Sequence, residues 1–285
     1  MTTNYAHESG IFSVAAAITF AALYGLFLVW YLYMSLRRPI HIYYGLALFC
    51  TTRVAAFSMR AALASSESAG ENLALLDADQ ILFSVGFLVL LYTSHKLVLD
   101  LEHLTKQPLP KNLIYHFLSS HWLFHVLLAA AVATTIAAAC TSDGNGTDST
   151  SDKLEIASTI LFLALTLLQA FQTVVFAWIE LSGVSISLLG IIWSNQGMAA
   201  ARKNPDASDD SFMRNYGVFI LLLISMLFLV REGFLLATMT DYDKYLNEHF
   251  LYPLVFVPQL LVVILYTIPK LLPAREDITS SAGHA

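Results

Sequence analysis

The chain has 285 residues, of which 57% are hydrophobic and only 13% are charged, and its formal net charge is −6. Soluble domains carry about 25% charged residues, so this composition indicates an integral membrane protein. The acidic balance and the lack of a lysine- or arginine-rich cluster argue against nucleic-acid binding, and a lipid bilayer is the expected surrounding.

Seven apolar stretches are long enough to be membrane spans, since a helix needs about 20 residues to cross about 30 Å of hydrocarbon. They cover approximately residues 11–36, 42–64, 78–98, 113–140, 154–179, 216–238 and 250–272. These stretches predict an all-α, polytopic seven-helix bundle. We expect a single membrane domain over residues 1–285, ending in a short cytosolic tail at residues 273–285.

Two segments depart from simple spans. Apolar character continues after the fifth stretch through residues 184–196. This segment is expected to be either an extension of the fifth helix, broken near Ser182-Gly183, or an amphipathic segment at the membrane surface. Pro258 lies inside the seventh stretch and predicts a kink in that helix.

The basic residues predict the orientation. Ten of the 15 lysines and arginines lie in or beside the linkers that follow spans one, three, five and seven, and only Lys153 and Lys244 lie in the other linkers. The positive-inside rule therefore places the N-terminus outside or in a lumen and the C-terminus in the cytosol. The sequon Asn145-Gly146-Thr147 lies in an outside linker, so N-glycosylation of Asn145 is expected.

Three arginines lie within the apolar stretches, namely Arg53, Arg60 and Arg231. A charge at membrane depth costs about 2.5–3.5 kcal/mol on insertion scales unless it finds a partner or a wet cavity. Arg53 and Arg60 are seven residues apart, which is close to two helical turns, so both lie on one face of the second helix. That face must point into the bundle.

Acidic residues near the outer end of the bundle are the candidate partners. Asp77 and Asp79 lie at the start of the third helix and are natural partners for Arg60. Glu232 is the carboxylate nearest in depth to Arg53, and Arg231 could share the two aspartates. Adjacent helical residues point about 100° apart, so Arg231 and Glu232 are not expected to pair with each other.

These six charged residues have two interpretations. They form either a structural network that locks helices two, three and six together, or an outward-facing pocket for a small anionic or zwitterionic ligand. Three acids would balance three bases, which leaves little charge for a ligand.

Histidines form a second group of candidates. His121 and His125 are four residues apart on the fourth helix, so they could chelate one metal ion or simply pack between helices. With Ser120 they raise the hypothesis of a metal-dependent membrane lipid hydrolase. The only lysine of the seventh stretch, Lys270, lies at its cytosolic end rather than at mid-helix, where a retinal Schiff base would need it. No cofactor is expected.

Short motifs carry a resemblance to a known family. The second helix reads Arg53-Val-Ala-Ala-Phe57-Ser58-Met59-Arg60, the sixth contains Arg231, and the seventh closes on Leu271-Leu272-Pro273. These motifs resemble the seven-helix tobamovirus-multiplication proteins of plants and the related lysosomal orphan-receptor proteins of animals, although Pro269-Lys270 replaces the Trp-Glu of the animal members. The resemblance implies a non-enzymatic protein of an endolysosomal or vacuolar membrane that recruits small GTPases or other cytosolic partners.

The leading functional hypothesis is therefore a receptor-like or scaffolding membrane protein in an endolysosomal, vacuolar or plasma membrane. Its cytosolic loops, residues 96–112 and 195–214, would contact the partners. The alternative is a transporter or channel for a small solute, with the arginines lining its intramembrane site.

Overall fold

The computed structural model describes Tyr5, residues 10–104, 121–141, 149–193, 206–238 and 248–268, and Leu271. At residues 103, 104, 121, 139, 140, 149–152, 182–193 and 206–215 it describes the backbone alone. Throughout this part of the chain the regular elements are helices, and no strand occurs. The predicted tail at residues 273–285 and the sequon at Asn145 lie outside the described residues.

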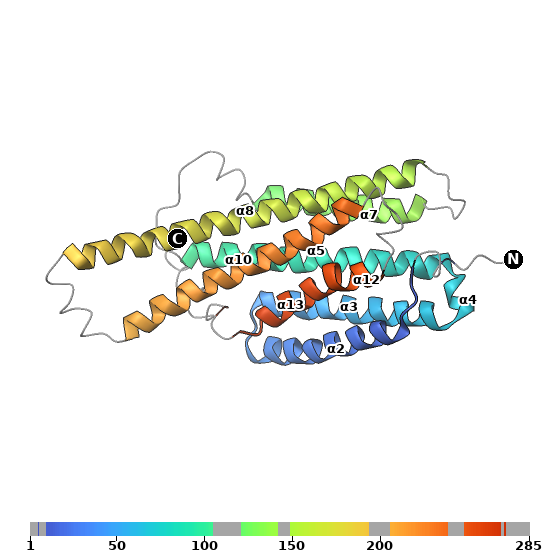
Figure 1. The fold of residues 1–285 in the computed structure, drawn as a ribbon, viewed down its shortest axis with the longest axis horizontal. Helices are drawn as coiled ribbons and strands as arrows, with labels where there is room; N and C mark the ends of the chain where they lie inside the picture. Colours follow the sequence, from blue (N-terminus) through green and yellow to red (C-terminus); the bar gives the residue numbers. More distant parts are fainter. Residues whose placement is uncertain are drawn as a thin grey trace.

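Long helices lie side by side along the long axis of the molecule (Figure 1). In chain order the elements are α2 (Val14–Arg37), α3 (His41–Ser65), α4 (Glu67–Gly70), α5 (Leu73–Leu104), α7 (His121–Thr141), α8 (Ser149–Trp193), α10 (Asp206–Thr238), α12 (Glu248–Leu251), η1 (Tyr252–Phe256) and α13 (Val257–Leu265). The last three follow one another directly and form the helix predicted from the seventh apolar stretch.

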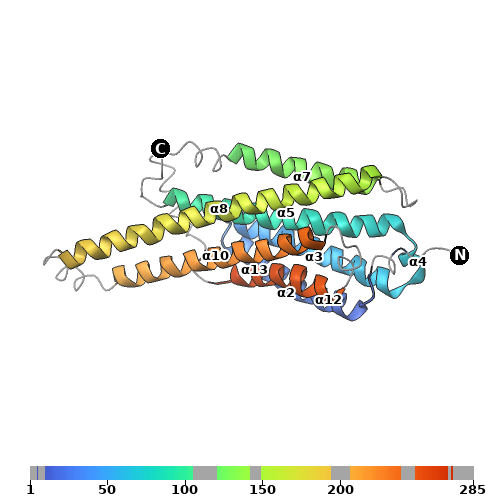
Figure 2. The ribbon, with the colours of Figure 1, turned by 45° about the horizontal axis from the view of Figure 1, so that its top comes forward.

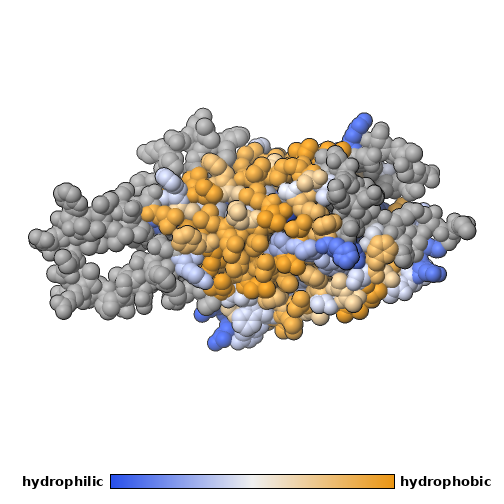
Figure 3. All heavy atoms as spheres, viewed as in Figure 1, coloured by the Kyte–Doolittle hydropathy of each residue, from blue (hydrophilic) through white to orange (hydrophobic). Residues whose placement is uncertain are grey.

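Six helical segments of the described chain are long and apolar enough to cross a membrane. They are Val14–Arg37, His41–Ser65, Leu73–Glu102, Lys153–Leu181, Tyr216–Thr238 and Glu248–Leu265. Trp122–Ala138, within α7, is a shorter apolar helix. Hydrophobic residues predominate in the middle of the face that Figure 3 shows, as expected of a multi-pass integral membrane protein.

Several predicted segments differ from the observed helices: α10 begins at Asp206 rather than near residue 216, and the last helix ends at Leu265 rather than near residue 272. α5 begins at Leu73 rather than near residue 78, because apolar residues precede Asp77 and the Asn72 side chain accepts a hydrogen bond from the Leu75 amide (3.4 Å). α8 continues without interruption to Trp193, so the break expected near Ser182-Gly183 is absent. The apolar residues after the fifth span are an extension of its helix.

An aromatic belt surrounds one end of the bundle. Its side chains are 45–74% exposed: Trp30, Tyr33, Tyr44, Trp122, Trp178 and Tyr216. Arg37, Arg38 and Lys96 lie at the same end, which we call the basic end. Tryptophan and tyrosine gather at the interface between membrane and water, so the belt marks one boundary of the hydrocarbon layer.

α8 and α10 project past the other helices at the basic end (Figures 1 and 2). From Trp178 in the belt, α8 runs on to Trp193, about 22 Å at 1.5 Å per residue. α10 begins at Asp206, about 15 Å before Tyr216 in the belt. The two helices therefore extend beyond the membrane boundary that the belt defines.

The final helix contains the irregularity expected from Pro258. A π-helical turn, η1, comes just before this proline, and the Val257 amide donates to the Tyr252 carbonyl five residues earlier. Proline has no amide proton and cannot make the normal helical bond, so a change of winding is expected there. At the start of the same helix, the Glu248 carboxylate accepts hydrogen bonds from the amides of Phe12 and Ser13, both at 3.1 Å. This contact ties the last helix to the start of α2.

α3 lies between α2 and α5 and packs closely on α5 through glycine. A Cβ atom added to Gly45 would overlap the Thr93 hydroxyl of α5. A Cβ atom added to Gly86 of α5 would lie 2.7 Å from the Thr52 hydroxyl and 3.4 Å from the Arg53 guanidinium. Small residues allow two membrane helices to approach at the backbone.

We predict that Gly45→Ala lowers the thermal stability of the purified protein in detergent. Overpacking against Thr93 should cost about 1–3 kcal/mol, more than the roughly 1 kcal/mol that alanine gains over glycine within a helix. Gly25→Ala is the control, because a Cβ there meets nothing within 4 Å and should be neutral or stabilising. Thr93→Ala should rescue Gly45→Ala; a double variant no more stable than Gly45→Ala would contradict this packing.

Candidate functional site

Five charged side chains from α3, α5 and α10 are buried in the bundle. Arg53 is 0% exposed, Arg60 8%, Arg231 6%, and Asp79 and Glu232 are both 0% exposed. We call these five residues the charged cluster. Each was a site residue predicted from the sequence.

Asp77, the sixth predicted residue, lies apart from the charged cluster. It is only half-buried, and it makes no hydrogen bond or ion pair within the described residues. The directions of the two side chains around α5 explain the difference. Asp77 and Asp79 are two residues apart, so they point about 200° from each other around the helix axis. Only Asp79 faces α3.

Arg60 and Asp79 join α3 to α5, which is one of the two pairings that the sequence predicted for Arg60. The Arg60 Nε lies 3.4 Å from Asp79 Oδ2. The guanidinium also lies over two aromatic rings, with its Cζ 4.9 Å from the centre of Phe83 and 5.3 Å from that of Phe256. Such cation–π contacts contribute more when the cation is removed from water.

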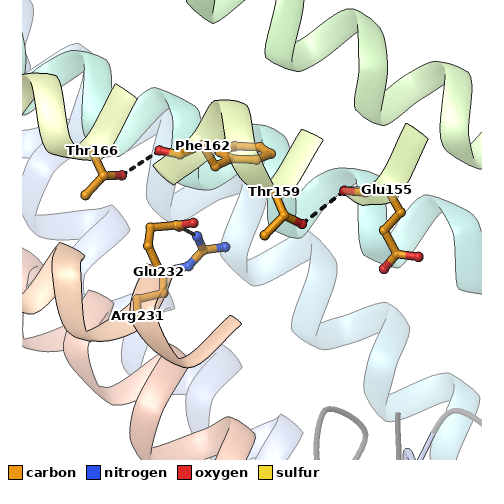
Figure 4. A network of polar contacts seen from close by, with 6 residues as sticks. All are labelled: Glu155, Thr159, Phe162, Thr166, Arg231 and Glu232. Atoms are coloured by element: carbon orange, nitrogen blue, oxygen red, sulfur yellow. Dashed lines mark hydrogen bonds and ion pairs between the residues drawn. The ribbon is translucent and has the colours of Figure 1, made fainter. Parts of the chain in front are cut away.

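Arg231 binds its own neighbour Glu232, and the expectation that the two could not pair was wrong. Arg231 Nη1 donates a hydrogen bond to Glu232 Oε1, and the guanidinium Cζ lies 3.7 Å from the ring centre of Phe87. Figure 4 shows the arginine folded back to the glutamate on the side of α10 that faces α8. The 100° between adjacent helical residues applies at Cβ, and the long, flexible arginine side chain spans it.

Arg53 has no carboxylate partner in the described structure. None of its three guanidinium nitrogens makes a hydrogen bond to a described residue. Instead its Cζ lies between two rings, 4.9 Å from the centre of Phe49 and 4.8 Å from that of Phe83. The pairing of Arg53 with Glu232 expected from the sequence is therefore not observed, because Glu232 is engaged by Arg231.

The charged cluster consequently carries an excess of positive charge. It contains three guanidinium groups and two carboxylates, and each carboxylate already contacts an arginine other than Arg53. A third buried acid, Glu180 of α8, is about 21 Å further along its helix than Thr166, which lies near the Arg231 pair (Figure 4). Arg53 is the unbalanced charge.

Charged and neutral polar groups lie near Arg53: Asp79 and Arg231 interact with it electrostatically, although neither makes a hydrogen bond to it. Tyr24 of α2 and Cys50 of α3 are near enough to interact electrostatically with it, and Tyr24 packs on Phe49 with ring centres 5.7 Å apart. The Tyr24 side chain is fully buried, and its hydroxyl has no hydrogen-bond partner in the part of the chain described. Gln259 of α13 is 1% exposed, and neither its amide nitrogen nor its oxygen has such a partner there.

A second polar layer lies closer to the basic end. His95 Nδ1 shares a hydrogen bond with Gln172 Oε1 (2.6 Å), and the His95 ring stacks on Phe124 at 3.8 Å. The hydroxyls of Ser94 and Tyr266 share another (2.7 Å). These contacts join α5 to α7, α8 and the end of the last helix, so the role of this layer is to hold helices together.

The histidine metal site predicted from the sequence gains no support. His125 packs edge-on against Tyr92 with ring centres 5.4 Å apart, and the His121 side chain lies outside what the structure describes. Among the described residues, no group of three or more His, Cys, Asp or Glu side chains is arranged to hold a metal ion.

Sequence reasoning missed the aromatic residues of the site. Phe49, Phe83 and Phe87 lie against the three arginines, and Tyr24 presents a buried hydroxyl beside Arg53. Aromatic residues are common in any apolar stretch, so these had no distinguishing signal. Phe83 and Phe87 are four residues apart on α5, and Phe49 is four residues before Arg53 on α3, but these spacings become informative only once the arginine-bearing face is known.

No family model, no curated protein and no solved structure matches the chain. What the charged cluster can do must therefore follow from its own geometry. The Arg60–Asp79 pair holds α3 to α5, and Arg53 is left as a buried cation that can attract a negative charge.

We predict that Asp79→Asn destabilises the protein more than the double change Asp79→Asn with Arg60→Gln. Removing one partner of a buried pair leaves the other charge uncompensated, at a cost of about 3–5 kcal/mol, whereas removing both avoids that cost. Thermal unfolding in detergent measures the effect. Asp77→Asn is the matched control and should change little. Additive effects of the two single changes would rule out the coupling.

Proposed function

We propose that the chain is a receptor-like, seven-helix membrane protein that engages cytosolic partners at its basic end. The observation that carries this proposal is the projection of α8 and α10 beyond the aromatic belt. Two helices that leave the membrane together offer a partner a rigid surface, which short loops at a bilayer surface do not.

The proposed topology has seven spans with the N-terminus outside or lumenal. α7 supplies the seventh span, since its apolar core, Trp122–Ala138, is extended by the apolar residues of the predicted stretch 113–140. Seven antiparallel spans put the linkers rich in lysine and arginine at one end of the bundle. The belt of tryptophan and tyrosine at that end supports a membrane boundary there.

Glycosylation tests this topology. When the protein is expressed in eukaryotic cells, we predict that Asn145 carries an N-linked glycan, so that endoglycosidase treatment increases the mobility of the wild type in a denaturing gel. Asn145→Gln should abolish the shift. As a control, a sequon introduced into the 195–205 linker should stay unmodified, because that linker is on the cytosolic side. Modification of that linker would reverse the proposed orientation.

The family resemblance suggests the partner and the membrane. It favours a small GTPase as the cytosolic partner and an endolysosomal or vacuolar location. Arg214 of the α10 projection, together with Arg202 and Lys203 of the linker between α8 and α10, would supply positive charge to such a partner at the cytosolic surface. Charged groups at the rim of an interface steer association and select partners.

We predict that the protein in lipid nanodiscs binds one or more membrane-associated small GTPases, with different affinities for their GDP and GTP-analogue forms. Combining Arg202→Glu, Lys203→Glu and Arg214→Glu should weaken binding about tenfold or more in biolayer interferometry, since like charges across an interface are repulsive. Lys153→Glu, an exposed change at the opposite end, should leave binding intact. Failure of every GTPase to bind, or equal loss in both variants, would refute the assignment.

A small-solute transporter or channel is the second candidate, and the unbalanced charge of Arg53 favours it. Charged residues at membrane depth commonly mark solute or ion pathways. The two candidates respond differently to Arg53→Gln. A transporter would lose flux in proteoliposomes while still reaching the membrane, whereas a scaffold that folds would keep its partner binding.

A further inference from the structure

Arg53 is the least well compensated charge in the described part of the bundle. It lies at the middle of α3, is completely buried, and has no hydrogen-bond partner for Nε, Nη1 or Nη2 among the described residues. Cation–π contacts with Phe49 and Phe83 partly stabilise its positive charge. They leave all its N–H groups without acceptors, and a buried guanidinium without acceptors is strongly disfavoured.

The other charges of the charged cluster cannot neutralise Arg53 completely. Asp79 contacts Arg60, and Glu232 contacts Arg231. Asp79 Oδ1 and Glu232 Oε2 have no hydrogen-bond partner among the described residues, so either carboxylate could also accept from Arg53, but the excess of one positive charge would stay in the charged cluster. One negative charge from outside the chain would balance it.

Neutral donors lie at the same depth as Arg53. The Tyr24 hydroxyl is buried beside it without a partner, and the Gln259 amide is likewise unpartnered. Gln259 is on the helix that carries Phe256, three residues nearer the basic end, and Phe256 contacts Phe57 of α3 with ring centres 5.0 Å apart. Since the two helices are antiparallel, this places Gln259 at the level of Arg53.

The packing limits the size of a bound group. Two phenylalanine rings flank the guanidinium, and a Cβ atom on Gly86 would already lie 3.4 Å from its Cζ and Nη1. The α5 backbone therefore approaches the guanidinium closely and limits the size of a group on that side. The apolar rings also disfavour a heavily hydrated or multiply charged ion, because its desolvation would be too costly.

We infer that Arg53 binds one compact monovalent anion within the membrane-embedded bundle, with Tyr24 and Gln259 as additional hydrogen-bond donors. Two sources share this chemistry: a chloride ion from the aqueous phase, or the carboxylate of a lipophilic acid from the bilayer. The site goes beyond the proposed partner-engaging function, since it needs neither a partner nor transport.

Binding of radioactive chloride to the purified full-length protein tests the site. We expect the wild type to bind one anion per chain, measured by scintillation proximity in gluconate buffer of constant ionic strength. Gluconate is too large and too hydrated to enter. Displacement of chloride by dodecanoate but not by acetate would identify the lipophilic acid as the preferred ligand, whereas no displacement by dodecanoate would identify chloride.

Three variants assign the binding to Arg53. Arg53→Gln should abolish it, and Tyr24→Phe should weaken it about tenfold, equal to about 1.4 kcal/mol. Arg37→Gln, an exposed arginine on α2, is the control and should bind as the wild type does. If Arg53→Gln does not elute as a monodisperse protein, Arg53→Lys replaces it, because lysine keeps the charge but loses the planar set of donors; it should bind at least tenfold more weakly.

Two results would overturn the inference. The first is a wild type that binds neither chloride nor dodecanoate. The second is binding that remains unchanged when Arg53 and Tyr24 are substituted. Because the assay contains no cytosolic partner, failure here leaves the proposed receptor-like function untouched, and loss of GTPase binding leaves the anion site untouched.

Discussion

A buried positive charge with no carboxylate of its own is the constraint on which the centre of this protein depends. Three guanidinium groups enter an apolar bundle that supplies two carboxylates to meet them. The helices that carry them must therefore face one another, since any arginine turned to lipid would cost about 2.5–3.5 kcal/mol. This requirement selects the face of α3 that packs on α5 and turns Arg231 of α10 toward Phe87 of α5.

Aromatic rings stabilise the buried arginines, a role that additional acidic side chains would have in a more polar core. Phe49, Phe83 and Phe87 each lie against an arginine, and Phe256 joins Phe83 over Arg60. A ring face attracts a cation without adding a group that must itself be paired. The glycines of α3 and α5 complete the arrangement, because they let the two backbones approach closely enough for these contacts.

The pairing of the charges could be predicted only in part. Arg60 was expected to pair with Asp77 or Asp79, since all three lie near one end of neighbouring antiparallel helices, and the structure shows the pair with Asp79. The Arg231–Glu232 pair and the isolation of Arg53 were not foreseen. Choosing among several acids at similar depth requires the rotation of each helix about its axis and the conformation of each long side chain, and periodicity alone constrains neither.

The sequence alone determined the class of protein, the approximate position of the apolar helices and that the three arginines within them must face inward. These follow from local properties, since span length and hydropathy are read from consecutive residues and the cost of a charge in hydrocarbon holds wherever it occurs. Only the tertiary structure decided that α8 runs unbroken to Trp193, that Asp77 lies apart, and that Arg53 is the charge left over. Those outcomes depend on which faces of different helices meet, and that is a property of the packed bundle rather than of any one segment.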